Sequence, residues 1–151
     1  MVSIQRAARA DLPAVEDLLR RSDLDPDGLG EHMDTVIVAR SGGQVVGSAG
    51  LEVYGRSALL RSVAVDEVLR GQGLGQRLTK AALDMARDAG VSSVYLLTRT
   101  AVEFFPRCGF VAIERQHLPL AVQSSGQFRT ECAKTATFMM LSLNPEEKDA
   151  A

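Results

Sequence analysis

Short apolar runs alternate with amphipathic segments along most of the chain. Runs rich in Val, Leu and Ala predict strands at residues 2–6, 36–39, 45–53, 59–65 and 94–97. A Ser-Gly-Gly turn at residues 41–43 joins the second and third of these strands into a hairpin. Between the fourth and fifth, the apolar residues Leu74, Leu78, Ala81 and Met85 share one helical face. They predict a helix that packs on a sheet and that Gly90 ends.

The remaining segments continue the alternation of strands and helices. Residues 11–21 predict a helix with Leu12, Val15, Leu18 and Leu19 on one side, and residues 101–108 predict a short one. Residues 110–113 and 136–143 predict two last strands. Residues 22–33 are rich in turn formers and residues 118–129 have no clear period. With no internal repeat, this order favours a mixed α/β layer structure.

Composition narrows the class of protein further. A length of 151 residues with 46% hydrophobic content suits one domain over residues 1–151. Seventeen basic and nineteen acidic residues leave a net charge of −2, so we expect neither a nucleic acid nor a membrane as partner. Cys108 and Cys132 are too few for a disulfide framework and form no zinc pattern, and we expect no metal site. Charged residues interrupt the N-terminal segment, which predicts a soluble, cytoplasmic protein.

The most informative motif is Arg-Gly-Gln-Gly-Leu-Gly at residues 70–75, between the fourth strand and the long helix. Gly71, Gly73 and Gly75 have no Cβ, so their N–H groups can approach a ligand closely. At a helix N-terminus, unpaired N–H donors and the helix dipole both favour an anion. Arg70 adds a full positive charge, so the motif predicts a phosphate site.

Two commoner phosphate motifs do not fit these residues. A Walker A loop needs Lys and then Ser or Thr after its last glycine, whereas Gln76 and Arg77 follow Gly75 here. A dinucleotide fingerprint begins directly after its strand, but residues 66–70 intervene and the third glycine comes one position early. A glycine turn that merely starts a helix remains an alternative.

This loop, with its strand and helix, resembles the acetyl-coenzyme A pyrophosphate loop of the GNAT superfamily of N-acetyltransferases. The likeness extends over residues 59–110, up to Phe-Phe-Pro-Arg-Cys-Gly-Phe at residues 104–110. It implies a central, mostly antiparallel sheet of about six to seven strands, flanked by helices and splayed between the fourth and fifth strands. It also implies acetyl-CoA as cofactor, with the diphosphate on the loop and the pantetheine amides pairing with the exposed edge of the fourth strand. The cofactor-binding residues are then Val63, Ala64, Val65, Arg70, Gly71, Gln72, Gly73, Leu74, Gly75, Gln76 and Phe105.

Amide formation from a thioester needs a base, and the resemblance implies an acidic residue on the acceptor side. Glu52, near the end of the third strand, is the candidate base, acting directly or through a water. An exposed strand-end acid without a catalytic role is the alternative. His32 and His117 are rival bases that rank below Glu52. A backbone N–H around Val63 is the expected donor to the developing oxyanion.

The departing thiolate lacks its usual partner. Many members of the superfamily carry a Tyr in the short helix, where this chain has Phe105. Tyr54 or Tyr95 could supply the proton instead, or water, or the thiolate could leave unassisted because a thiol pKa of about 8.5 makes a fair leaving group. We favour water or unassisted departure. Cys108 fits better as a small buried hydrophobe than as a reactive thiol.

Three arginines are candidates to bind an acceptor carboxylate, because a guanidinium pairs with it through two hydrogen bonds. Arg61 lies on the fourth strand, Arg99 follows the fifth, and Arg129 precedes the last. For Arg61, a structural ion pair with Asp or Glu is an equal alternative. Residues 22–33 overhang the acceptor site in the resembled fold and could form a mobile lid.

Residues 95–100 and 104–110 are similar to the acetyltransferase module of N-acetylglutamate synthases, and still more to the small arsenic-resistance-associated N-acetyltransferases. The resemblance implies direct acetyl transfer to a small amine acceptor, an amino acid or analogue with a carboxylate, and a detoxification role. A homodimer is a further expectation. The alternatives are a non-catalytic acyl-CoA-binding module, which Phe105 favours, and an enzyme that modifies protein N-termini or aminoacylated RNA.

Overall fold

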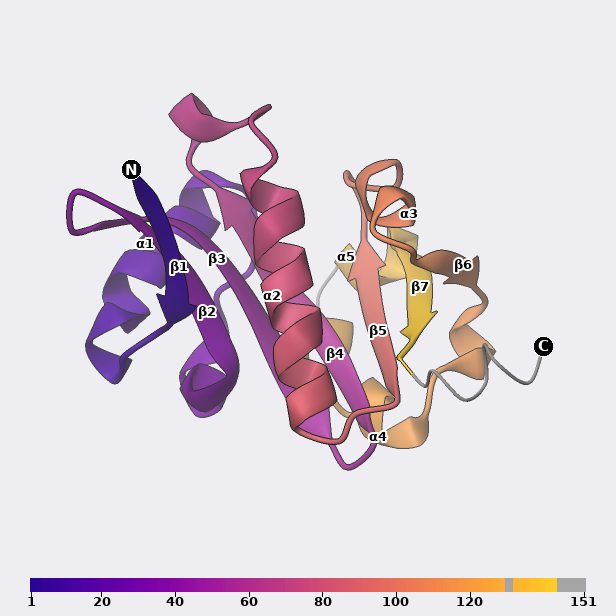
Figure 1. The fold of residues 1–151 in the computed structure, drawn as a ribbon. Helices are drawn as coiled ribbons and strands as arrows, with labels where there is room; N and C mark the ends of the chain where they lie inside the picture. The colour runs from indigo at the N-terminus through magenta and orange to yellow at the C-terminus, as the bar shows by residue number, and fades with distance from the viewer. Residues whose placement is uncertain (130–131, 144–151) are drawn as a thin grey trace. The chain divides into compact units, whose positions relative to one another are not determined.

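The structure is a computed structural model that describes residues 1–129 and 132–143. Seven strands follow the hydrogen-bonded order β1-β2-β3-β4-β5-β7-β6 (Figure 1). The chain divides into two compact units, one of Met1–Glu52 with Leu60–Ala82, and one of Val53–Leu59 with the described residues from Leu83 onward. Strand β4 and helix α2 each contribute residues to both units. Because the chain divides into these two units, a single domain over residues 1–151 stays a prediction.

The first unit contains an antiparallel ladder made by β1 (Val2–Arg6), β2 (Val36–Ser41) and β3 (Gln44–Tyr54). Its helices are α1 (Leu12–Arg21) and the short 3-10 segments η1 (Arg9–Asp11), η2 (Leu29–Thr35) and η3 (Glu67–Leu69). The predicted apolar side of α1 is buried, and it packs with residues of η2 and β2 in a core formed by Val15, Leu18, Leu19, Leu29, Met33, Val36, Val38 and Ala64. Leu29 and Met33 thus pack η2 against the core of this unit.

Helix α2 (Leu74–Asp88) approaches β3 closely because a glycine faces it. A Cβ built on Gly47 would lie 2.7 Å from Leu78 Cδ1 and 3.3 Å from the Ala64 carbonyl oxygen. Figure 1 shows α2 in front of β3, and the contact explains why an apolar strand carries glycine at this position. At its other end, Gly90 has φ +82° and Val91 N–H bonds the Ala86 carbonyl, so the predicted glycine cap is confirmed.

The second unit contains the start of β4 (Ser57–Val65) together with β5 (Ser93–Thr98), β6 (Val111–Ile113) and β7 (Thr137–Ser142). Parallel pairing of β4 with β5 covers only Ser57–Leu59 against Ser93–Tyr95, whereas β5, β7 and β6 pair antiparallel. Such short pairing confirms the predicted splay between the fourth and fifth strands. It leaves residues 60–65 of β4 outside the β5 ladder.

Short helices fill the rest of the second unit: α3 (Phe104–Arg107), η4 (Arg115–His117), α4 (Leu120–Gln123), η5 (Gly126–Arg129) and α5 (Cys132–Thr135). Residues 118–129, which show no period, are therefore short helical turns rather than an open loop. Leu118, Val122 and Phe128 from this stretch pack with Leu59 and Tyr95 in one core. One apolar residue holds each of these turns in the core, Val122 in α4 and Phe128 in η5, and such single residues are too sparse to show a period.

Within the described residues, no helix has both the length and the apolar character needed to cross a membrane. The same residues contain no group of three or more His, Cys, Asp or Glu that could hold a metal ion.

Candidate functional site

The glycine loop leads into the N-terminus of α2 as the sequence predicts. Gly71 and Gly73 both have φ +82°, a left-handed conformation that other residues adopt only with strain. A Cβ at either glycine would meet no atom of the described structure within 4 Å, so these backbone faces are open. Leu74, Gly75 and Gln76 form the first turn, where N–H groups have no acceptor inside the helix. An open face lined with N–H donors suits an anion.

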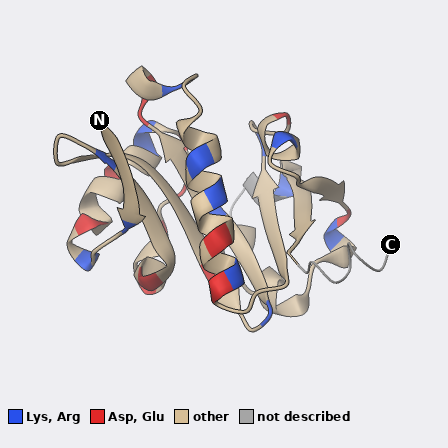
Figure 2. Cartoon of the chain, viewed as in Figure 1, with Lys and Arg blue, Asp and Glu red and all other residues tan. Residues whose placement is uncertain are grey.

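Charge along α2 supports the same interpretation. Its first turn contains no acidic residue, although acids are the side chains that a helix N-terminus ordinarily favours. Figure 2 shows basic residues, Arg77 and Lys80 in the sequence, in the N-terminal half and acidic ones only further along the helix. Arg70 Nε donates to the Val65 carbonyl at 3.0 Å, which ties the loop back to the end of β4. The N-terminus of α2 is therefore electropositive.

A strained residue interrupts β4 directly before Val63. Ser62 has φ +61° inside the strand and is buried, and its carbonyl accepts a 2.7 Å bond from Ser48 Oγ. Non-glycine residues in this conformation cost about 1–3 kcal/mol and often occur at functional sites. Beyond it, Val63 and Val65 are half-buried while Ala64 is buried. The left-handed residue turns the peptide that carries the Val63 N–H, the expected oxyanion donor, out of regular strand geometry.

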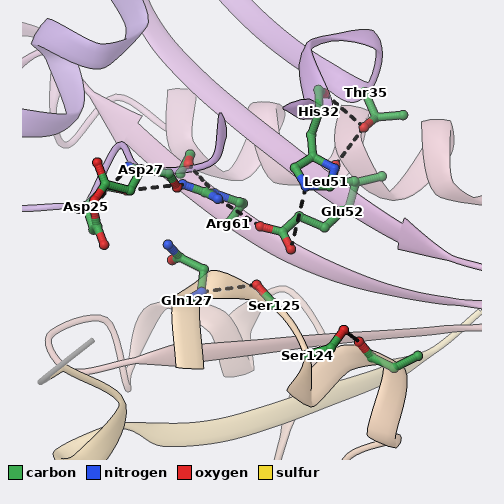
Figure 3. Close-up of polar contacts among 12 residues, drawn as sticks. Asp25, Asp27, His32, Thr35, Leu51, Glu52, Arg61, Ser124, Ser125 and Gln127 are labelled. Carbon is green, nitrogen blue, oxygen red and sulfur yellow. Dashed lines mark hydrogen bonds and ion pairs between the residues drawn. The ribbon is translucent and has the colours of Figure 1, made fainter. Parts of the chain in front are cut away.

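Glu52 is buried in a charged cluster, not exposed at a strand end (Figure 3). Arg61 Nη1 donates to Glu52 Oε2 at 2.8 Å, and both side chains are at most 3% exposed. His32 Nε2 lies 3.8 Å from Glu52 Oε1, and the His32 side chain remains 23% exposed. The Arg61 guanidinium therefore holds the Glu52 carboxylate in a fixed position. His32 forms the partly exposed side of the cluster.

Arg61 makes at least four of the five hydrogen bonds that a guanidinium can donate. Besides Glu52, its acceptors are Ser62 Oγ at 3.0 Å from Nε, and the carbonyls of Asp25 and Asp27 at 3.2 and 2.9 Å from Nη2. This arrangement supports the structural ion pair that the sequence left open as an alternative to carboxylate binding. Arg61 as an acceptor-binding residue stays a prediction.

His32, the rival base ranked below Glu52 from the sequence, lies beside Glu52 in the structure. It belongs to η2, where Thr35 Oγ1 bonds both the His32 carbonyl at 3.1 Å and the Leu51 carbonyl at 2.6 Å. Those two bonds fix the end of η2 beside the residue preceding Glu52. The apolar residues Leu29 and Met33, one to three positions away, were the available signal that this turn-rich segment is packed. The other rival base, His117, is exposed in the second unit.

The second unit contains the remaining candidates. Phe105 is buried, with edge-to-face contacts to Phe104 and Phe110, and Tyr95 belongs to the core. Burial raises the pKa of the Cys108 thiol, which keeps it protonated near neutrality.

Two arginines complete the set of candidates. Arg99 is exposed directly after β5. The side chain of Arg129 lies outside the described part of the structure. Both stay predictions as acceptor-binding residues.

Two curated relatives resemble the chain in sequence. It is 36% identical over 90 residues to an uncharacterized N-acetyltransferase of Chlorobaculum tepidum, covering 59% of this chain and 57% of that protein. It is 30% identical over 127 residues to an amino-acid acetyltransferase of Mycobacterium tuberculosis, covering 74% of this chain and 69% of that protein. The chain thus spans little more than half of the first relative and about two thirds of the second.

The fold matches a solved structure along nearly its whole length. The structure of Rv2747 from Mycobacterium tuberculosis, in complex with CoA and NLQ, has a TM-score of 0.76 and 26% identity, covering 94% of this chain and 99% of that one. The family model described as an acetyltransferase (GNAT) domain matches residues 32–112, which include Glu52, β4 and the glycine loop. The chain therefore belongs to the GNAT acetyltransferase domain family.

Proposed function

We propose that the protein is an acetyl-CoA-dependent N-acetyltransferase that acts on the amine of a small, carboxylate-bearing acceptor. The observation that carries the proposal is the open, left-handed glycine loop at the electropositive start of α2. A diphosphate fits this loop, because N–H donors face its open side, Arg70 belongs to it and the first turn of α2 contains no acidic residue. The relative Rv2747 was solved with CoA, which supports the same ligand for this family member.

Acetyl-CoA supplies an acetyl thioester, and this chain supplies the groups that move protons and stabilise charge. Glu52 accepts the proton that the acceptor ammonium must lose, directly or through a water, before its nitrogen attacks. The Val63 N–H, beside the left-handed Ser62, donates to negative charge on the acetyl carbonyl oxygen. As the new C–N bond forms and the C–S bond breaks, the electron pair leaves with sulfur, and the second proton of the amine passes to water or to the thiolate. The acetyl group transfers without an acyl-enzyme.

Helix α3 contains no tyrosine that could act as the usual acid. Phe105 occupies that position in α3 and has no proton to donate. Departure as a thiolate, protonated afterwards by water, needs no such residue because a thiol pKa of about 8.5 lies near neutrality. We count Phe105 as an apolar wall for the cofactor. This role, like that of residues 63–65 as a partner for pantetheine amides, rests on the family resemblance.

The amino-acid acceptor is the finer part of the proposal. The Mycobacterium tuberculosis relative is named an amino-acid acetyltransferase. Arg99, exposed at the carboxyl end of β5, is the candidate partner for the acceptor carboxylate, with Arg129 as the second. A detoxification role, a cytoplasmic location and a homodimer stay predictions from the sequence.

A non-catalytic acyl-CoA-binding module and an acetyltransferase for protein amines are the competing functions. Thiol release from acetyl-CoA, measured across amino acids, their decarboxylated amines and a peptide with a free N-terminus, separates the three. We expect release that depends on an amino acid and falls when its carboxylate is removed. CoA binding without acceptor-dependent release would identify the module, and turnover of the peptide alone would identify a protein acetyltransferase. Either result would overturn the proposed acceptor.

A further inference from the structure

Arg61 joins the candidate base to a turn that lies far away in the sequence. We call residues 25–28, of sequence Asp-Pro-Asp-Gly, the 25–28 turn. The guanidinium contacts this turn through Nη2, which donates to two of its backbone carbonyls, and contacts Glu52 through Nη1 (Figure 3). A single buried side chain therefore connects β3, β4 and the segment that leads into η2.

The 25–28 turn is shaped to present those carbonyls. Asp25 Oδ1 accepts the Asp27 N–H at 2.9 Å, and the Leu29 N–H bonds the Pro26 carbonyl at 3.2 Å. Gly28 has φ +81°, and a Cβ there would lie 3.6 Å from Arg61 Nη1. The local bonds leave the carbonyls of Asp25 and Asp27 pointing at the guanidinium.

An acceptor carboxylate would have to displace these contacts to reach Arg61. At least four of its five donors already have protein acceptors, and only 2% of its side chain is exposed. A binding residue for a small anion instead keeps donors free toward solvent. The geometry fits a residue that holds other groups in place.

We propose that Arg61 is a positioning residue that fixes the 25–28 turn and orients the Glu52 carboxylate, and that it does not bind the acceptor. The inference rests on the proposed function for the role of Glu52 and goes beyond it by giving Arg61 a different task. Because one guanidinium serves both groups, the order of the 25–28 turn depends on the same side chain that holds the base. We call these contacts of Arg61, to Glu52 and to the carbonyls of Asp25 and Asp27, the latch. Because of the latch, the 25–28 turn does not move freely as a lid.

Hydrogen–deuterium exchange tests the latch without any turnover. In Arg61→Lys, one ammonium cannot reach the Glu52 carboxylate and both carbonyls, so we expect the amides of residues 27–31 to exchange at least tenfold faster. Arg40→Lys is the matched control, since Arg40 pairs with Asp11 at the start of α1. It should leave residues 27–31 unchanged. Equal exchange at residues 27–31 in wild type and Arg61→Lys would overturn the latch.

A second variant covers the case in which Arg61→Lys does not fold. Gly28→Ala retains the Arg61–Glu52 pair but strains the turn at φ +81° and adds a methyl beside the guanidinium. We expect the same tenfold rise in exchange for residues 27–31, with CoA affinity within twofold of wild type. Unchanged exchange in Gly28→Ala would contradict the latch as well. If the wild-type protein does not bind CoA, that result would instead count against the proposed function.

Kinetics distinguish a positioning residue from an acceptor-binding one. For an amino acid that turns over and its decarboxylated amine, Arg61→Lys should lower kcat/KM by the same factor, within about twofold. If Arg61 binds the acceptor carboxylate, the loss would be confined to the amino acid, and the proposal would fail.

Discussion

Arg61 and Glu52 form a buried ion pair in which Nη1 lies 2.8 Å from Oε2 and neither side chain is more than 3% exposed. The two residues belong to neighbouring strands in sequence order, β4 and β3. Burying two charges costs free energy unless both are paired and hydrogen-bonded. Here Arg61 donates at least four of its five possible hydrogen bonds to protein acceptors. The pair therefore behaves as one unit, and each partner's role depends on the other.

Glu52→Gln tests the base. Glutamine keeps an oxygen that can accept from Arg61, so the cluster should keep its geometry while the proton acceptor is lost. We expect kcat for acceptor-dependent thiol release to fall by about 10²–10⁴-fold, the usual contribution of general base catalysis. CoA affinity should stay within twofold. Asp17→Asn, which breaks a solvent-exposed pair with Arg21, is the control and should retain full activity. Retention of more than half of kcat by Glu52→Gln would remove Glu52 from the mechanism.

Ser62 tests whether β4 is held in a strained conformation. Its φ of +61° suits glycine and disfavours β-branched residues. We expect Ser62→Val to be less stable than Ser62→Gly by about 1–3 kcal/mol in urea unfolding. Ser57→Val, at the start of the same strand, should change the free energy of unfolding by no more than about 0.5 kcal/mol. Equal stability of the two Ser62 variants would show that the strain is absent.

Gly47 tests the close contact between β3 and α2. Alanine there would place its Cβ 2.7 Å from Leu78 Cδ1 and 3.3 Å from the Ala64 carbonyl oxygen, so the Leu78 side chain and its neighbours must move to make room. Overpacking of this kind costs about 1–3 kcal/mol, measurable by chemical denaturation. Gly126→Ala meets no atom within 4 Å and is the control. A Gly47→Ala protein as stable as the control would contradict this packing.

Asp11 makes stability depend on acid pH. Its carboxylate accepts bonds from Arg40 and from the Ala8 N–H, and the Arg40 bond is the main reason that the pKa of Asp11 is lowered from 3.8. A lowered pKa contributes stability that is fully present above the unfolded value and is lost as the pH falls through the folded one. Arg40→Met should thus cost roughly 0.5–2 kcal/mol at pH 7, and less as the pH drops below about 4.

Thermal or urea unfolding at pH 7 and pH 3 measures this effect. Arg87→Met, which breaks a half-exposed pair with Asp84, should cost no more than about 0.5 kcal/mol at either pH. A penalty for Arg40→Met that is the same at both pH values would show that Asp11 does not titrate with folding.

The sequence predicts most of the fold because its strongest signals are local. The stripe from Leu74 to Met85 and the caps at Gly73 and Gly90 define α2 almost to the residue. Residues 118–129 show no period because their helices are single turns. A stretch of four residues is too short to display a 3.6-residue period.

The candidate site is harder to predict because its contacts are long-range. Glu52 was identified as the candidate base, and Arg61 as either an acceptor-binding residue or one partner of an ion pair, but nothing local indicates which acid pairs with Arg61. The partners of Arg61 in the 25–28 turn are backbone carbonyls, which every residue has and no sequence motif marks. The strain at Ser62 is equally invisible, because serine is unremarkable in a strand sequence.

Calorimetric titration of CoA into the wild-type protein, Gly73→Val and Gly90→Val tests the central claim, that the loop before α2 binds the CoA diphosphate. Gly73 and Gly90 both have φ +82° and open space around a built Cβ, at opposite ends of the same helix, so the two variants carry matched backbone strain. We predict saturable binding to wild type, at least tenfold weaker binding to Gly73→Val, equivalent to about 1.4 kcal/mol, and wild-type affinity in Gly90→Val. The absence of binding to the wild-type protein, or equal affinities for the two variants, would contradict the account.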